Sequence, residues 1–117
     1  METIKGPGYE IVIHDFLEKQ LLSLKAQALF QWHNVWNRIA QIISSPRGHH
    51  WHPHQLTGSD DPAVAGMWAA DAIQGTGGRG AYRLLYEIHA EASSNNPTTK
   101  ITFRGIYDYH NGKYVLY

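Results

Sequence analysis

The chain has 117 residues, in which ten lysines and arginines balance ten aspartates and glutamates, and it contains no cysteine. This length fits one domain, residues 1–117, around a single hydrophobic core. The absence of cysteine excludes disulfides, iron–sulfur clusters and thiolate zinc sites. No segment approaches the roughly 18 apolar residues of a membrane span, and the N-terminal residues lack the apolar centre of a signal peptide. We therefore expect a cytoplasmic protein that does not bind a membrane.

The first half of the sequence predicts a strand followed by a helical hairpin. Tyr9–Ile13 (YEIVI) is rich in β-branched residues and alternates, which is typical of a strand. Asp15 is the predicted N-cap of a helix. Apolar residues then recur at helical spacing as far as Ile43. One helix of that length would be about 43 Å long, more than a domain of this size covers, so we predict two antiparallel helices with a break between Lys25 and Gln31.

In the middle of the chain, Ser44–Asp61 is predicted to be a loop, because prolines and glycines interrupt it and few of its residues are apolar. Residues 62–75 fit either a short helix or a loop that leads into a strand around Trp68–Ile73. The loop also holds a tight histidine cluster: His49, His50, His52 and His54. Imidazoles are the usual ligands of zinc, copper and nickel, but the spacing supplies no defined third ligand. We expect no metal and no cofactor, and keep metal binding by these histidines as an alternative.

The last third predicts antiparallel strands joined by turns. Two strands are expected at Ala81–Ala90 (AYRLLYEIHA) and Ile101–His110 (ITFRGIYDYH), separated by a polar loop. The pair Asn111-Gly112 is a strong hairpin signal and makes Lys113–Tyr117 the last strand. The predicted fold class is therefore α+β: an N-terminal strand, a helical hairpin, and a twisted antiparallel sheet of three or four strands.

Alternation along these strands groups the candidate catalytic residues. Arg83 shares a strand face with His89, and Arg104 is expected to share one with Ile106 and His110. A guanidinium can grip a phosphate with two hydrogen bonds, and an imidazole titrates near neutral pH, so these groups suit a phosphodiester substrate. The alternative is that arginine and histidine here are simply the solvated face of an antiparallel strand.

Further side chains in the same region are candidates for contacts with the substrate. They are Arg79, Lys113, Tyr109 and Tyr117. Arg79 belongs to a glycine-rich segment, residues 75–80, that we interpret as a hairpin turn. By strict alternation Tyr107 and Tyr109 point away from Arg104 and His110, which makes at least one of these tyrosines a core residue.

These motifs together resemble the RelE/ParE superfamily of bacterial toxins. The similarity spans residues 9–117 and consists of YEIVIHD, a helical hairpin, YRLLYEI, a hydrophilic turn and ITFRGIYDYHNGKY. The resemblance implies a RelE-like toxin that binds a cognate antitoxin and cleaves mRNA, often on the ribosome, without a metal. In that reaction the ribose 2′-hydroxyl attacks the adjacent phosphorus while an acid and a base transfer protons. It implies catalytic roles for His110, Arg104 and Arg83.

Two other functions stay open from the sequence. A toxin with the same scaffold can inhibit a protein such as DNA gyrase without cutting RNA. Alternatively, the histidine-rich loop makes this a binding or metal-sensing module with no enzymatic activity.

Overall fold

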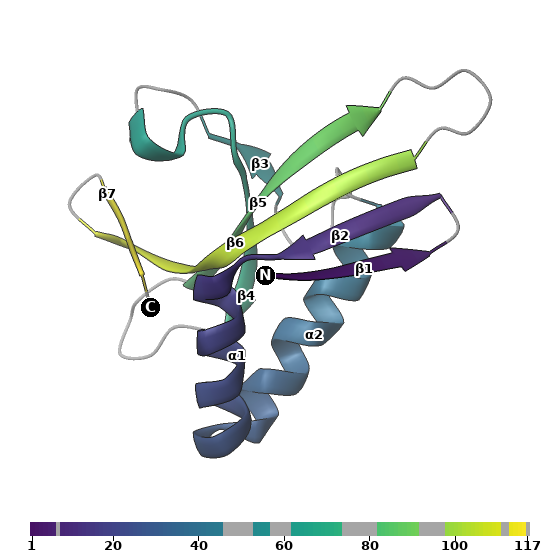
Figure 1. Ribbon diagram of the computed structural model, residues 1–117. Coiled ribbons are helices and arrows are strands. Elements are labelled where there is room, and N and C mark those ends of the chain that lie inside the picture. The colour runs from purple at the N-terminus through teal and green to yellow at the C-terminus, as the bar shows by residue number, and fades with distance from the viewer. Residues whose placement is uncertain are drawn as a thin grey trace.

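A computed structural model describes residues 1–6, 8–45, 53–56, 62–73, 82–91, 98–110 and 113–116 (Figure 1). In chain order the elements are β1 (Glu2–Gly6), β2 (Tyr9–Ile13), α1 (Asp15–Gln27), α2 (Leu29–Ser44), β3 (His54–Gln55), the 3₁₀ turn η1 (Pro62–Val64), β4 (Trp68–Ile73), β5 (Tyr82–Glu91), β6 (Thr98–His110) and β7 (Lys113–Leu116). These elements confirm the predicted α+β class. For residues 62–75, the strand interpretation is correct, since β4 follows the short turn η1.

The described strands join one mixed sheet in the order β1-β2-β6-β5-β4-β3, with β7 also paired to β6. The antiparallel pairs β5–β6 and β6–β7 were predicted. The pairing of the N-terminal strand was not predicted: β2 joins this sheet in parallel with β6. A parallel pair needs a crossover connection, which here contains both helices. The strand β1 was not predicted; its side chains are mostly exposed at the sheet edge, so its sequence carries no apolar alternation.

The helical hairpin breaks at Ala28, inside the predicted interval. The N-cap of α1 is His14 rather than Asp15, because Nδ1 of His14 accepts a hydrogen bond from the backbone N–H of Phe16 at 3.2 Å. Asp15 is the first helical residue, where its negative charge favours the helix N-terminus. Neither described helix is long and apolar enough to cross a membrane.

The main core lies between the helices and one face of the sheet (Figure 1). Its fully buried members include Leu17, Val35, Ile39 and Ile42 from the helices, and Ile11, Leu84, Tyr86, Ile101, Phe103 and Ile106 from the strands. A smaller cluster contains Leu56, Val64, Ala69 and Leu85, with Met67 and Tyr107 packed against it. Leu85 alternates with Leu84 and Tyr86, so this second cluster lies on the opposite face of the sheet, which we call the helix-free face.

Candidate functional site

A β-bulge in β6 determines where its side chains point. Leu85 of β5 pairs with Gly105, and the next residue, Tyr86, pairs with Phe103, so Arg104 has no partner residue in β5. Phe103 and Ile106 are both fully buried in the core beneath the helices. Two residues, Arg104 and Gly105, therefore lie between the inward-pointing Phe103 and Ile106, where a regular strand has only one residue.

The bulge corrects two predictions made from strict alternation. Arg104 and Ile106 do not share a face, since Ile106 points to the helices. Tyr107, expected to point away from Arg104, packs against the cluster on the helix-free face, and the positive charge of Arg104 acts on its hydroxyl. Alternation holds only without an inserted residue, and the bulge brings Arg104 and Tyr107 to one side of the sheet.

Arg83 joins this site from the neighbouring strand. Its backbone is paired with Tyr107 on one side and with Asp71 of β4 on the other. Nε of Arg83 lies 3.8 Å from Oδ1 of Asp71, and the two side chains are 34% and 35% exposed. Arg83, Arg104 and Tyr107 thus form a group on the helix-free face, which we call the arginine site. Sequence reasoning missed Asp71, whose signal is a single charge within the apolar strand WAADAI.

The environment of Tyr107 holds its hydroxyl proton more tightly than that of an exposed tyrosine. Burial raises the pKa of the Tyr107 hydroxyl, and the nearby charge of Arg104 lowers it by a smaller amount. The net effect keeps the hydroxyl protonated at neutral pH, because its pKa lies above the usual value near 10. Tyr107 is consequently a hydrogen-bond donor at this site rather than a base.

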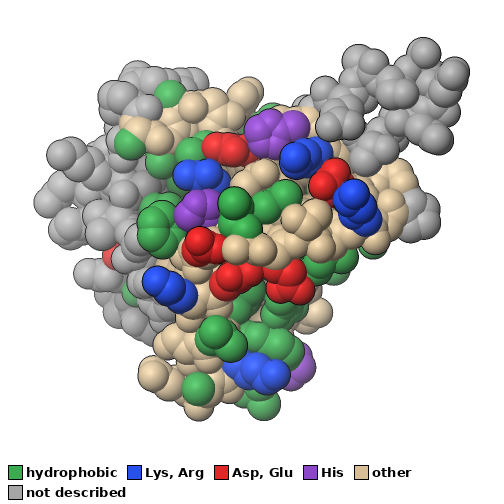
Figure 2. Space-filling view, in the orientation of Figure 1, with side chains coloured by type: hydrophobic (Ala, Val, Ile, Leu, Met, Phe, Trp, Pro, Cys, Tyr) green, Lys and Arg blue, Asp and Glu red, His purple; other side chains and the backbone are tan. Residues whose placement is uncertain are grey.

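Other polar residues continue along the helix-free face of β5. His89 shares the face of Arg83, as predicted, and its Nε2 lies 3.4 Å from Oε2 of Glu87. In Figure 2 basic, acidic and histidine side chains are interspersed over the strands, whereas acidic side chains gather around the start of α1. The coloured part of this view presents individual cations among carboxylates, so phosphate recognition would rest on a few specific side chains.

Several predicted site residues lie partly or wholly outside the described residues. Tyr109, His110 and Lys113 are described by their backbone, with Tyr109 paired to Tyr114 and His110 paired to Lys113 in the predicted hairpin. Their side chains, together with Arg79 and Tyr117, are outside the described part. The same is true of His49, His50 and His52 and of the side chain of His54. Within the described ranges, no three His, Asp or Glu side chains gather where they could hold a metal ion.

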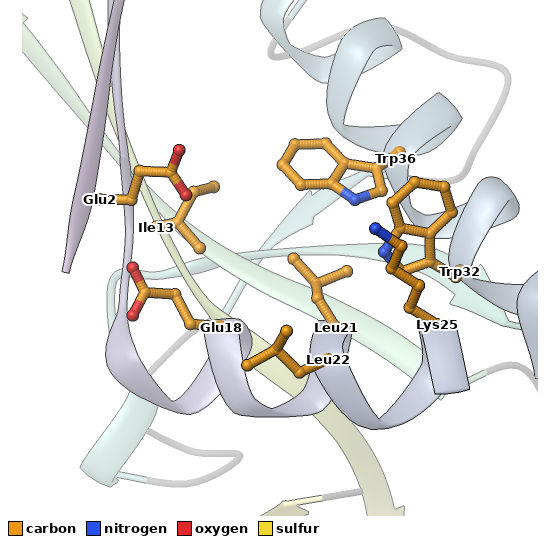
Figure 3. A pocket seen from close by; sticks show the side chains of 8 residues that line it. All are labelled: Glu2, Ile13, Glu18, Leu21, Leu22, Lys25, Trp32 and Trp36. Atoms are coloured by element: carbon orange, nitrogen blue, oxygen red, sulfur yellow. The ribbon is translucent and has the colours of Figure 1, made fainter. Parts of the chain in front are cut away.

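A separate cavity of about 300 Å³ lies on the other side of the sheet, between β1, β2 and the two helices (Figure 3). It is lined by Glu2, Ile13, Glu18, Leu21, Leu22, Lys25, Trp32 and Trp36. Nζ of Lys25 lies 5.4 Å from the centre of the Trp32 ring. The buried indole N–H of Trp36 has no hydrogen-bond partner among the described residues, and Leu22 is 70% exposed. This helix-side pocket is mostly apolar and was not predicted from the sequence.

The architecture is a helical hairpin packed on a sheet in which β6 pairs in parallel with β2 near the N-terminus. Among solved structures, the chain is similar to the YoeB/ParE toxin from Agrobacterium tumefaciens, with a TM-score of 0.62 and 12% sequence identity. The match covers 86% of this chain and 96% of that one. No protein-family model and no curated protein matches the sequence. The similarity confirms the predicted fold.

Proposed function

We propose that this protein is the toxin of a toxin–antitoxin pair and acts as an endoribonuclease on mRNA without a metal ion. The proposal is supported by the toxin-like fold together with the arginine site, where Arg83 of β5 is the cross-strand partner of Tyr107 and the charge of Arg104 acts on the Tyr107 hydroxyl. The partners that follow from the proposal are a cognate antitoxin and mRNA, presented on the ribosome.

The proposed reaction needs few groups from the protein. The ribose 2′-oxygen forms a bond to the adjacent phosphorus and gives its proton to a base. The bond from phosphorus to the 5′-oxygen breaks, and an acid protonates that oxygen, so the products end in a 2′,3′-cyclic phosphate and a 5′-hydroxyl. Negative charge grows on the phosphoryl oxygens in between, and donors placed to meet it lower the barrier.

Each member of the arginine site has a role that suits this chemistry. Arg83 and Arg104 carry permanent charge and would each bind phosphoryl oxygens with their forked donors. Tyr107, held protonated by burial, would donate a further hydrogen bond. His110 remains our candidate acid or base, because an imidazole exchanges protons near neutral pH. Arg79, Lys113, Tyr109 and Tyr117 remain candidates for binding the RNA.

Induced expression in bacteria, followed by mapping of RNA ends, tests this proposal. Growth should stop, and cleaved mRNA should carry 2′,3′-cyclic phosphates even when a chelator is present. Arg83→Ala, Arg104→Ala and His110→Ala should each relieve the arrest. Lys5→Ala, which removes an exposed cation from the edge strand β1, is the matched control and should stay toxic. Intact mRNA in a lysate that contains ribosomes, together with normal growth, would refute the proposal.

A second candidate, a toxin that binds a protein such as DNA gyrase, is favoured by the helix-side pocket and the exposed Leu22 beside it. A mostly apolar pocket that continues into an exposed apolar side chain offers a concave surface on which a segment of another protein can bind. This function would produce DNA-damage signalling with intact mRNA. It would tolerate His110→Ala and be lost in Leu22→Ser, the reverse of the pattern expected for the nuclease.

A further inference from the structure

The side chain of Gln20 in α1 is hydrogen-bonded to the backbone of Ile106 in both directions. The N–H of Ile106 donates to Oε1 of Gln20 at 2.8 Å, and Nε2 of Gln20 donates to the carbonyl oxygen of Ile106 at 2.9 Å. The two residues are far apart in sequence, and the pair is partly buried. A primary amide can both accept and donate hydrogen bonds. The side chain of Gln20 therefore pairs with the backbone N–H and carbonyl of Ile106 in the way that a neighbouring strand would.

Gln20 occupies a gap along one edge of β6. Phe103 and Tyr107 both pair with β5 on one side of the strand. On the other side β2 pairs with β6 as far as Phe103, and β7 begins its pairing at Tyr107. The backbone N–H of His14, just after β2, donates to the carbonyl of Phe103 at 3.0 Å. On this side of β6, Ile106 thus lies between the part paired with β2 and the part paired with β7. The side chain of Gln20 provides the hydrogen-bond partner that neither strand provides there.

This gap coincides with the bulge that creates the arginine site. Gly105 and Arg104 immediately precede Ile106. A bulge lengthens one strand by a residue, and its location depends on what fixes the backbone on either side. The amide of Gln20 fixes Ile106 from the side that β5 does not reach. It therefore holds the bulge at Arg104, the outward direction of Tyr107, and the position on β6 where pairing with the end of β7 starts.

We propose that Gln20 is a positioning residue for RNA cleavage: it touches no substrate and acts by holding the bulged segment that presents Arg104 and Tyr107. This inference rests on the proposed function and adds to it a residue from the helical face. The physical reason is that a displacement of about 1 Å in a group that binds the reacting phosphate can cost on the order of a hundredfold in rate.

Two substitutions separate positioning from folding. Gln20→Met keeps the length and the helix propensity of the side chain but removes both hydrogen bonds. Gln20→Glu keeps the shape, yet its ionised carboxylate faces the Ile106 carbonyl and cannot donate; only the protonated carboxyl reproduces both bonds. Gln27→Met, at an exposed position of the same helix, is the matched control.

The experiment measures kcat and KM for RNA cleavage by each purified full-length variant, its thermal unfolding, and hydrogen exchange at the Ile106 amide. For Gln20→Met we expect kcat to fall by about a hundredfold with little change in KM, faster exchange at Ile106, and a fully folded chain at the assay temperature. Gln20→Glu should regain activity relative to wild type as the pH falls towards about 5, where the introduced carboxyl becomes protonated. Gln27→Met should behave as wild type.

The results distinguish this inference from the proposed function. If Gln20→Met cleaves RNA as fast per folded molecule as wild type, the positioning role is wrong and the nuclease proposal stands. If activity is lost only in proportion to the unfolded fraction, Gln20 is merely structural and the inference is again wrong. A wild-type chain that cleaves no RNA refutes the nuclease proposal, and the role of Gln20 in it falls too.

Discussion

The ion pair between Arg83 and Asp71 should contribute little to stability, although Arg83 is central to the proposed function. At a separation of about 4 Å two unit charges attract by about 1 kcal/mol in water and by about 4 kcal/mol at the effective dielectric constant of a protein surface. The observed Nε to Oδ1 distance is 3.8 Å and each side chain is about one third exposed, so solvent screens the pair. Exposed pairs of this kind contribute about 0.2–1 kcal/mol.

A double-mutant cycle tests this expectation. Arg83→Gln and Asp71→Asn are made singly and together, and urea unfolding gives the free energy of unfolding of all four proteins. The coupling between the two changes should stay below about 1 kcal/mol. In parallel, Arg83→Gln should reduce RNA cleavage by on the order of a hundredfold or more, because one donor to the developing charge is lost. Lys5→Gln, which removes a cation from the exposed edge of the sheet, should change neither quantity.

Two results would contradict this reasoning. A coupling above about 2 kcal/mol would exceed what a screened surface pair supplies and would make Arg83 a structural residue. Cleavage that survives Arg83→Gln undiminished would remove Arg83 from the catalytic group.

Two further predictions concern the cap of α1 and the titration of Tyr107. His14→Ala should lower the free energy of unfolding by about 0.5–2 kcal/mol, because the N–H of Phe16 loses its acceptor, whereas His14→Ser should restore most of it; equal stability of the two variants in urea would contradict the capping role. The raised pKa of Tyr107 means that the folded state holds this proton more tightly than the unfolded state, so the associated stability is complete below pH about 10 and is lost as the pH rises through the folded pKa. Absorbance at alkaline pH should show a late-titrating contribution that is lost in Tyr107→Phe and titrates later still in Arg104→Gln; an unchanged titration in Arg104→Gln would mean that the two groups are not neighbours.

The local elements of this fold follow from short-range patterns, whereas its long-range pairings do not. Helical periodicity and chain length were enough to predict a break between Lys25 and Gln31, the interval that contains Ala28, and Asn111-Gly112 was enough to place the last hairpin. The parallel pairing of β2 with β6 joins segments that are far apart in sequence, and no local pattern encodes it. The edge strand β1 was not predicted because its side chains are mostly exposed, so its sequence does not need an alternating apolar pattern.

The candidate site shows why residue spacing alone misplaces side chains. Counting by two from Arg104 predicts Ile106 on its face, yet the core requires both Phe103 and Ile106, three positions apart, to point to the helices. A strand meets that requirement only by inserting one residue, and Gly105 is the residue type that often marks such an insertion. The sequence Phe-Arg-Gly-Ile therefore does contain the signal for the bulge. The bulge can be predicted only by assuming that Phe103 and Ile106 are both buried, instead of assuming that the polar residues alternate regularly. With that assumption Arg104 lies on the same face as Tyr107 and Arg83.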